Sequence, residues 1–262
     1  MQFKPFFTAF ILVTVACTNS GTSGRSENHP DQQTALSIAK DNPFERIKNI
    51  PLPAGFTRDE ISSDPFATFL RNIPLKKDRT VYLYDGRPKS NQSAQFAVLN
   101  VSVGNKDLQQ CADAVMRLRA EYQYAAGQFE QILFKDNNGT SYSFSRPFTR
   151  DNFDRYLFRV FGMCGSASLS KSLKPAGFAD IRPGDVLIHG GFPGHAVIVM
   201  DVASNAAGER IYLLAQSYMP AQDIHVLINP GNEDLSPWYA VNEETRIVTP
   251  EYVFHRTELK RW

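Results

Sequence analysis

The stretch PGDVLIHGGFPGHAVIVMDV, residues 183–202, constrains the fold more than any other part of the sequence. Two apolar runs, DVLIH and HAVIVMDV, flank the turn-forming residues GGFPG. Apolar runs with β-branched residues are typical of buried strands, and a turn this short joins antiparallel neighbours. Further strand-like runs follow at residues 210–218, 223–228 and 246–248. The last third of the chain therefore predicts an antiparallel sheet.

The stretch GNKDLQQCADAVMRLRAEYQY, residues 104–124, predicts a helix. Asp107 and Gln110 have the spacing of a capping box, which favours a helix start near Asp107. The apolar residues that recur at helical spacing are Leu108, Cys111, Val115, Leu118 and Tyr122. Their stripe has to be buried, so we expect this helix to pack against the sheet. The predicted fold class is α+β, with the helix carrying Cys111 near its N-terminus.

Local patterns predict further elements before and after this helix. Asp64 and Pro65 favour the start of a helix within residues 62–73. The pair Asn138-Gly139 predicts a hairpin between the runs QILFK and TSYSFS. A second long helix is expected over about residues 151–161, and the runs TVYLY (80–84) and FAVLNVSV (96–103) are strand-like.

The N-terminus predicts a targeting segment. Residues 1–17, MQFKPFFTAFILVTVAC, combine Lys4, an apolar stretch and a small residue before Cys17. This order resembles the lipobox of bacterial lipoproteins, which implies cleavage before Cys17 and acylation of that residue. Residues 18–42 are polar and predict a flexible tether, and residues 43–262 predict a single α+β domain. We therefore expect a lipid-anchored protein of the cell envelope, on the membrane and facing the periplasm or the exterior.

The composition argues against other partners. Lys and Arg total 28 against 27 Asp and Glu, so the formal net charge is +1. A chain without a long basic run is not expected to bind nucleic acid. The sequence has no apolar stretch of the roughly 20 residues that a membrane-spanning helix needs. No cofactor-binding motif is found, and none is expected to be needed.

Three polar residues in apolar surroundings suggest a catalytic site. A helix N-terminus lowers the pKa of a thiol, so Cys111 is a candidate nucleophile. His195 opens a strand and is a candidate general base. If Val202 faces Arg210, then His195 lies opposite Ser217, whereas a register one residue shorter places Gln216 there. Gln216 is the candidate for the residue that orients the imidazole.

Neighbouring residues complete this candidate site. The backbone N–H of Cys111 and the side chain of Gln110 are candidates for stabilising an oxyanion. His189 and Ser217 are further cleft candidates.

This pattern resembles papain-like cell-wall hydrolases of the NlpC and CHAP type. The matching residues are Cys111, Gly184-Asp185, the run Gly194-His195-Ala196-Val197, and Gln216. The resemblance implies a papain-like fold, with Cys111 as nucleophile and His195 as base. The third residue of that family is usually His, Asn or Glu, and here it is Gln216. The implied reaction is hydrolysis of an amide bond, with peptidoglycan peptide as the candidate substrate.

A second resemblance covers nearly the whole domain. The stretches IPLPAGF, FLRNIPLK, VYLYDGR, LQQCADAVMRLRAEY, LLAQSYMPAQDIHVL and SPWY, with residues 184–202, resemble domain of unknown function 4846. That family comprises uncharacterised bacterial lipoproteins. The resemblance implies a lipoprotein and no particular activity.

Three alternatives remain open at this stage. His189 and His195 with Asp185 or Asp201 could bind zinc, although H-x5-H is not an established ligand motif and no metal site is expected. A disulfide between Cys111 and Cys164 would exclude a catalytic thiol. The third alternative is a non-catalytic, lipid-anchored binding or assembly protein with a papain-like fold, whose aromatic contact surface would include Tyr218, Trp238 and Tyr239.

Overall fold

The computed structural model describes residues 41–61 and 63–262. The predicted signal segment, the lipidation site Cys17 and the tether up to residue 40 lie outside these residues. Asn42, which the tether was expected to include, is buried. Its side-chain amide donates hydrogen bonds to the backbone carbonyls of Phe44 and Lys76, at 3.0 and 2.9 Å. The folded part therefore includes the last residue of the expected tether.

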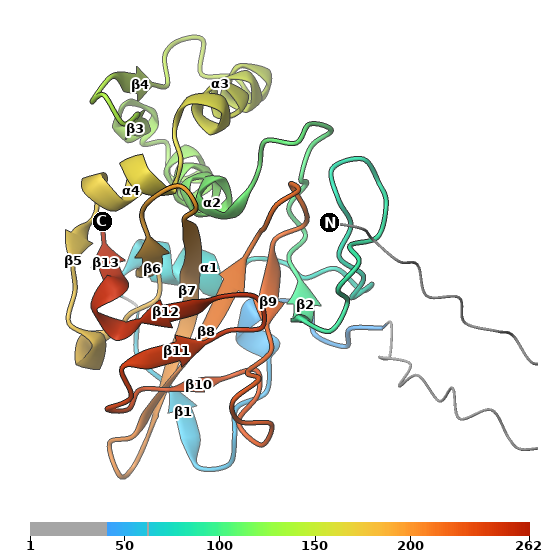
Figure 1. Cartoon of the computed structure of the whole chain (residues 1–262), viewed down its shortest axis with the longest axis vertical. Helices are drawn as coiled ribbons and strands as arrows, with labels where there is room; N and C mark the ends of the chain where they lie inside the picture. Colours follow the sequence, from blue (N-terminus) through green and yellow to red (C-terminus); the bar gives the residue numbers. More distant parts are fainter. Residues whose placement is uncertain (1–40, 62) are drawn as a thin grey trace, which may run out of the picture. The chain divides into compact units, whose positions relative to one another are not determined.

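A large antiparallel sheet organises the domain, and most of its strands come from the last third of the chain, as predicted (Figure 1). The first half adds β1 and β2, which the prediction did not place in this sheet. Its strands follow the order β2-β9-β8-β7-β6-β13-β5, while β1 pairs with β7 and β10 pairs with β8. Every strand pair in this sheet is antiparallel. The strands are β1 (Phe56–Arg58), β2 (Gln95–Val98), β5 (Lys174–Pro175), β6 (Val186–His189), β7 (His195–Asn205), β8 (Arg210–Gln216), β9 (His225–Leu227), β10 (Tyr239–Ala240) and β13 (Leu259–Arg261).

Both faces of the sheet are covered, which explains why its central strands are apolar without alternation. On β7, Ala196 and Ile198 point toward the helices and belong to the larger core cluster. Val197 and Val199 point the other way, into a second cluster that includes Phe254. The second face is covered by the hairpin of β11 (Arg246–Val248) and β12 (Val253–His255), which Figure 1 shows across β7 and β8.

Four helices are present in the described residues, and α2 packs directly on β7 and β8. They are α1 (Pro65–Arg71), α2 (Cys111–Ala125), α3 (Arg150–Met163) and α4 (Ser166–Ser172). None of the described helices is long and apolar enough to cross a membrane. The Asp64 carboxylate caps α1 by accepting from the N–H groups of Phe66 and Ala67, as predicted. The predicted start of the long helix near Asp107 is wrong, because α2 begins at Cys111.

The cap of α2 explains that shift. The backbone N–H of Gln110 donates to the Asp113 carboxylate at 3.0 Å, which places Gln110 at the N-cap. The side chain of Gln110 instead donates to Asp107 at 3.1 Å. The predicted capping pair therefore makes a contact in the preceding loop. Cys111 is therefore the first residue of α2, whereas the sequence placed it in the first turn or so of the helix.

The remaining elements are short. The predicted hairpin at Asn138-Gly139 is confirmed, and Gly139 has a φ of +84° in its turn. The run TVYLY was wrongly expected to be a strand, because Tyr82 and Leu83 form only isolated bridges. The other short elements are β3 (Leu133–Lys135), β4 (Ser141–Ser143), η1 (Ile47–Asn49), η2 (Phe129–Gln131), η3 (Phe178–Asp180) and η4 (Arg256–Glu258).

The β7–β8 turn is tighter than the sequence suggested, because β7 continues to Asn205, so Val202 pairs with Tyr212 and Arg210 pairs with Ser204. A β-bulge between Val199 and Asp201 then shifts the pairing by one residue. Both registers expected from the sequence are therefore wrong. The extra residue of a bulge turns a side chain to the other face. Here the buried Asp201 carboxylate meets the guanidinium groups of Arg58 and Arg71.

Replacing Asp201 with Asn is expected to lower the free energy of unfolding by about 3 kcal/mol, because Arg71 and Arg58 would lose their shared anion in a buried site. Chemical denaturation at pH 7 measures the change. Asp154→Asn is the matched control, since the Asp154–Arg150 pair is solvent-exposed and its loss should cost under about 1 kcal/mol. Equal effects of the two substitutions would contradict a structural role for the bulge carboxylate.

Candidate active site

Cys111 is the first residue of α2 and lies at the end of the helix that meets the sheet. Its side chain is 8% exposed, and the thiol is free. It lines a cleft of about 370 Å³ that is also bordered by Phe161, Cys164 and Gly194. The Cys111 side chain therefore borders an open cleft, unlike a cysteine sealed in a core.

Opposing influences act on the thiol of Cys111. Burial raises its pKa to about 11, and the Asp113 carboxylate adds to that rise. The backbone N–H groups of Ala112 and Ala196 favour the thiolate and act in the opposite direction. The positive end of the α2 dipole also favours the thiolate. Because burial dominates, the resting thiol is neutral at pH 7.

His195 is the first residue of β7 and is 2% exposed. Its ring points to the sheet face that the β11–β12 hairpin covers. The ring centroids of Tyr218, Tyr252 and Phe254 lie 4.8, 5.0 and 5.7 Å from its own. Aromatic packing on several sides holds the imidazole in one place.

Gly194 allows His195 to occupy this position. A Cβ at residue 194 would lie 2.7 Å from the carbonyl oxygens of His189 and Gly191, and 2.2 Å from the Ser166 hydroxyl. The two backbone carbonyls cannot move aside without distorting the turn, so only glycine fits where the turn packs against α4. The Gly-His pair in the sequence therefore has a steric cause.

Gln216 contacts His195, as the sequence analysis predicted, although not as its direct cross-strand partner. The ladder between β7 and β8 ends at the pair Ile198–Ala215, so Gln216 lies one step further, opposite Val197. A diagonal neighbour on the same face is still within reach of a long side chain. Gln216 Oε1 and His195 Nε2 are 2.8 Å apart, in a buried hydrogen bond.

This hydrogen bond defines which nitrogen of His195 can act as a base. An amide oxygen only accepts, so Nε2 carries the proton and Nδ1 of the neutral ring has a free lone pair. Burial lowers the pKa of His195 to about 4, and the Gln216 bond only partly opposes that effect. The imidazole is therefore neutral at pH 7.

Cys111 lies close to the start of β7. Its thiol lies beside the backbone N–H of Ala196, the residue that follows His195. The His195 ring itself packs against Tyr252 and Phe254. Among the described residues, Cys111 and Cys164 are both free and do not form a disulfide.

The three other site candidates have defined positions. Gln110 lines the cleft with its amide donating to Asp107. Ser217 is buried, and its hydroxyl lies 2.9 and 2.8 Å from the carbonyls of Gln109 and Gln222, so it ties the end of β8 to the loop before α2. His189 pairs with His195 across β6 and β7, but its side chain is half-exposed and bonds Glu258 at 2.6 Å.

The zinc alternative has no geometric support. Asp185 bonds Arg261 at 2.6 Å, and Asp201 is held by two arginines. Among the described residues, no group of three His, Cys, Asp or Glu side chains could hold a metal ion.

The aromatic contact surface considered as an alternative is not formed by the residues named for it. Trp238 and Tyr239 are 1% and 4% exposed. Trp238 Nε1 donates to the carbonyl of Pro51 at 2.8 Å. Only Tyr218 of the three is partly exposed. Trp238 and Tyr239 are core residues, because SPWY leads into β10 at the sheet.

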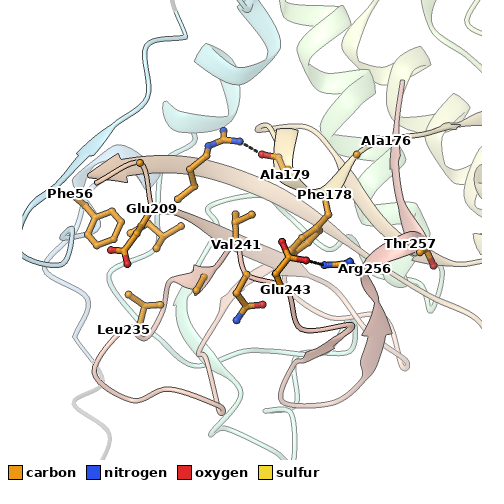
Figure 2. Close-up of a pocket in the computed structure, with 16 residues that line it drawn as sticks. Phe56, Ala176, Phe178, Ala179, Glu209, Leu235, Val241, Glu243, Arg256 and Thr257 are labelled. Atoms are coloured by element: carbon orange, nitrogen blue, oxygen red, sulfur yellow. Dashed lines mark hydrogen bonds and ion pairs between the residues drawn. The ribbon is translucent and has the colours of Figure 1, made fainter. Parts of the chain in front are cut away.

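A larger cavity lies away from these residues. It has a volume of about 870 Å³ and is lined by β1, η3 and β10 (Figure 2). Figure 2 shows Glu243 paired with Arg256 among the lining residues, and the two side chains are 2.9 Å apart. The guanidinium of Arg210 donates hydrogen bonds to the Asp59 carboxylate and to the backbone carbonyls of Ala179 and Ile181. None of the predicted site residues lines this cavity, so its size does not make it the candidate active site.

Two residues next to the site were missed by the sequence analysis. Glu251, in the turn between β11 and β12, accepts a hydrogen bond from Gln216 Nε2 at 2.7 Å. Lys89 pairs with Glu251 at 2.6 Å. Neither residue belongs to a motif, and both are far from Gln216 in the sequence. A buried ion pair has no local signal when its partners come from separate loops.

The fold is that of a mixed α+β protein with a large antiparallel sheet, in which Cys111 begins α2 and His195 begins β7. The sequence profile of the family described as Domain of unknown function (4846) matches residues 47–149 and 146–261, and the chain belongs to this family. No curated protein and no solved structure shows significant similarity to the chain.

Proposed function

We propose that the protein is a cysteine hydrolase that cleaves an amide bond. The observation that carries this proposal is the arrangement of Cys111, His195 and Gln216: a thiol at a helix start, beside the residue that follows an imidazole held by a carboxamide. Nucleophile, base and orienting residue are the parts that thiol acyl transfer needs.

The proposed reaction proceeds through an acyl-enzyme. Cys111 Sγ attacks the amide carbonyl while His195 Nδ1 accepts the thiol proton, because both groups are neutral at rest. The backbone N–H of Cys111, at the N-terminus of α2, is placed to stabilise the oxyanion. His195 returns the proton to the leaving amine as the C–N bond breaks. Water then cleaves the thioester, which regenerates the thiol and releases the acid.

The proposed substrate is a cell-wall peptide. Cys111, Gly184-Asp185 and the run Gly194–Val197 resemble papain-like hydrolases of the NlpC and CHAP type, which supports both a papain-like relationship and this substrate class. The N-terminal pattern at Cys17 supports a lipoprotein of the cell envelope, anchored where it can reach the wall. The cleft beside Cys111 is lined by the apolar side chains of Phe161, Phe192 and Met219, which suits an extended peptide.

The test uses the full chain in detergent micelles, incubated with intact peptidoglycan and with soluble peptides released from it. Mass spectrometry should detect one kind of cleaved amide bond as a new amine and a new carboxyl group. Pretreatment with iodoacetamide should stop the reaction. Folded protein that leaves every such peptide intact would overturn the proposal.

A second candidate is a non-catalytic, lipid-anchored binding or assembly protein. The observation that favours it is the resting electrostatics: burial raises the pKa of Cys111 and lowers that of His195, so no ion pair preforms. Retention of uncleaved cell-wall peptide by the protein, measured by isothermal calorimetry, would support this candidate.

A further inference from the structure

The contact between Gln216 and His195 does not by itself fix the orientation of the Gln216 carboxamide. The two ends of a carboxamide have nearly the same shape, so Gln216 could face His195 with its oxygen or with its nitrogen. The orientation of this amide determines which ring nitrogen of His195 carries the proton. If the nitrogen faced the ring, Nε2 would have to accept, and Nδ1 would carry the proton. Cys111 would then have no basic nitrogen to use.

Groups on the far side of Gln216 decide its orientation. Glu251 Oε2 lies 2.7 Å from Gln216 Nε2. An ionised carboxylate can only accept, so it selects the nitrogen end of the amide. The oxygen end is thereby directed to His195 Nε2, at 2.8 Å.

His225 strengthens the same choice. Its Nδ1 lies 2.9 Å from the carbonyl of Asp223, and a carbonyl only accepts, so Nδ1 carries the proton. Burial lowers the pKa of His225 to about 3, so the ring is neutral and its Nε2 is an acceptor. That nitrogen lies 3.5 Å from Gln216 Nε2. Both hydrogens of the Gln216 amide thus have an acceptor.

Lys89 and Asn91 hold Glu251 in place. The Lys89 ammonium lies 2.6 Å from Glu251 Oε2, and Asn91 Nδ2 lies 3.2 Å from Oε1. The side chains of Lys89 and Glu251 are 7% and 13% exposed. Burying an ion pair costs desolvation energy that its attraction often only balances, so such a pair is weak evidence for stability alone. Its contact with Gln216 suggests a role in orientation.

We propose that Glu251, anchored by Lys89, is a positioning residue that fixes the carboxamide of Gln216 and thereby the Nε2–H tautomer of His195. These four residues come from separate elements. Lys89 lies in a loop before β2 and Glu251 in the β11–β12 turn, while Gln216 ends β8 and His195 begins β7. The inference deepens the proposed function and rests on it for its meaning in catalysis. The tautomer itself can be measured whether or not the protein hydrolyses amides.

The experiment is ¹⁵N NMR of the histidine rings in the full, labelled chain at pH 7, with His195 assigned through a His195→Gln variant. Protonated and unprotonated ring nitrogens have well-separated shifts, so the spectrum reports the tautomer directly. The wild type should show His195 with the proton on Nε2. Glu251→Gln removes the acceptor that selects the amide orientation, so His195 should become a mixture of tautomers.

Glu258→Gln is the matched control, because Glu258 bonds the half-exposed His189 and should leave His195 unchanged. Glu251→Asp keeps the charge and should restore the Nε2–H form. An Nδ1–H form of His195 in the wild type would overturn the proposal even if no variant folds. An unchanged Nε2–H form in folded Glu251→Gln would overturn it as well.

Kinetics distinguish this inference from the proposed function. Once a cleaved peptide is known, Glu251→Gln should lower kcat about tenfold or more with little change in KM, because a wrong tautomer removes the base and not the binding site. Absence of hydrolysis would end the proposed function and leave the tautomer result standing. A mixed tautomer with an unchanged kcat would overturn the positioning role.

Discussion

Replacing Cys111 with Ala is expected to lower the rate of amide cleavage at least about a thousandfold, because the variant has no group that can form the acyl-enzyme. The fold should persist. The change removes one sulfur from a small side chain at the wall of a cleft, so the cost in stability should be about 1 kcal/mol. Product formation from cell-wall peptides and thermal unfolding of the same preparation measure the two effects.

Cys164→Ala is the matched control for this prediction. Cys164 lines the same cleft, is equally buried at 8% exposed, and caps the C-terminal end of α3. It is not part of the proposed site of Cys111, His195 and Gln216, so its loss should leave the rate within about threefold of wild type. Retained turnover in Cys111→Ala would refute the nucleophile assignment. Equal losses in both variants would indicate that only the cleft shape matters.

The rate at which iodoacetamide alkylates Cys111 is expected to rise about tenfold per pH unit from pH 7 to pH 10, about a thousandfold in total. The thiolate is the reactive form, and burial raises the pKa of this thiol to about 11, so the thiolate fraction grows with each unit below that value. Asp113 adds to the rise, while the N–H groups of Ala112 and Ala196 oppose it. Peptide mass spectrometry after short exposures gives the rate at each pH.

A preformed thiolate–imidazolium pair would behave differently. Labelling of Cys111 would then be fast at pH 6 and nearly constant up to pH 8, because the thiol would already be ionised. That outcome would contradict the neutral resting site. Cys164 in the same samples is the internal reference, since burial also raises its pKa to about 11.

The sequence predicted the elements that carry the site. The strands on either side of GGFPG, the helix with Cys111 and the hairpin at Asn138-Gly139 all follow from local apolar periodicity and turn chemistry. It also predicted that Gln216 contacts His195, for a reason that was partly wrong. The expected hairpin registers assumed a longer turn than the one that joins β7 to β8, and they did not include the bulge at Asp201. The partners of Asp201, Arg58 and Arg71, are more than 100 residues away in the chain.

By itself, the sequence determined that β7 is a buried strand that begins with a histidine and that Cys111 lies near the start of a helix, because residue periodicity is a local property. Only the tertiary structure decided how those residues behave. Packing against the sheet buried Cys111, raised its pKa and left the thiol neutral. The loop with Lys89 and the turn with Glu251 closed over Gln216 from distant parts of the chain. Desolvation and long-range hydrogen bonds depend on which segments meet in space, and the order of residues along one segment does not contain that information.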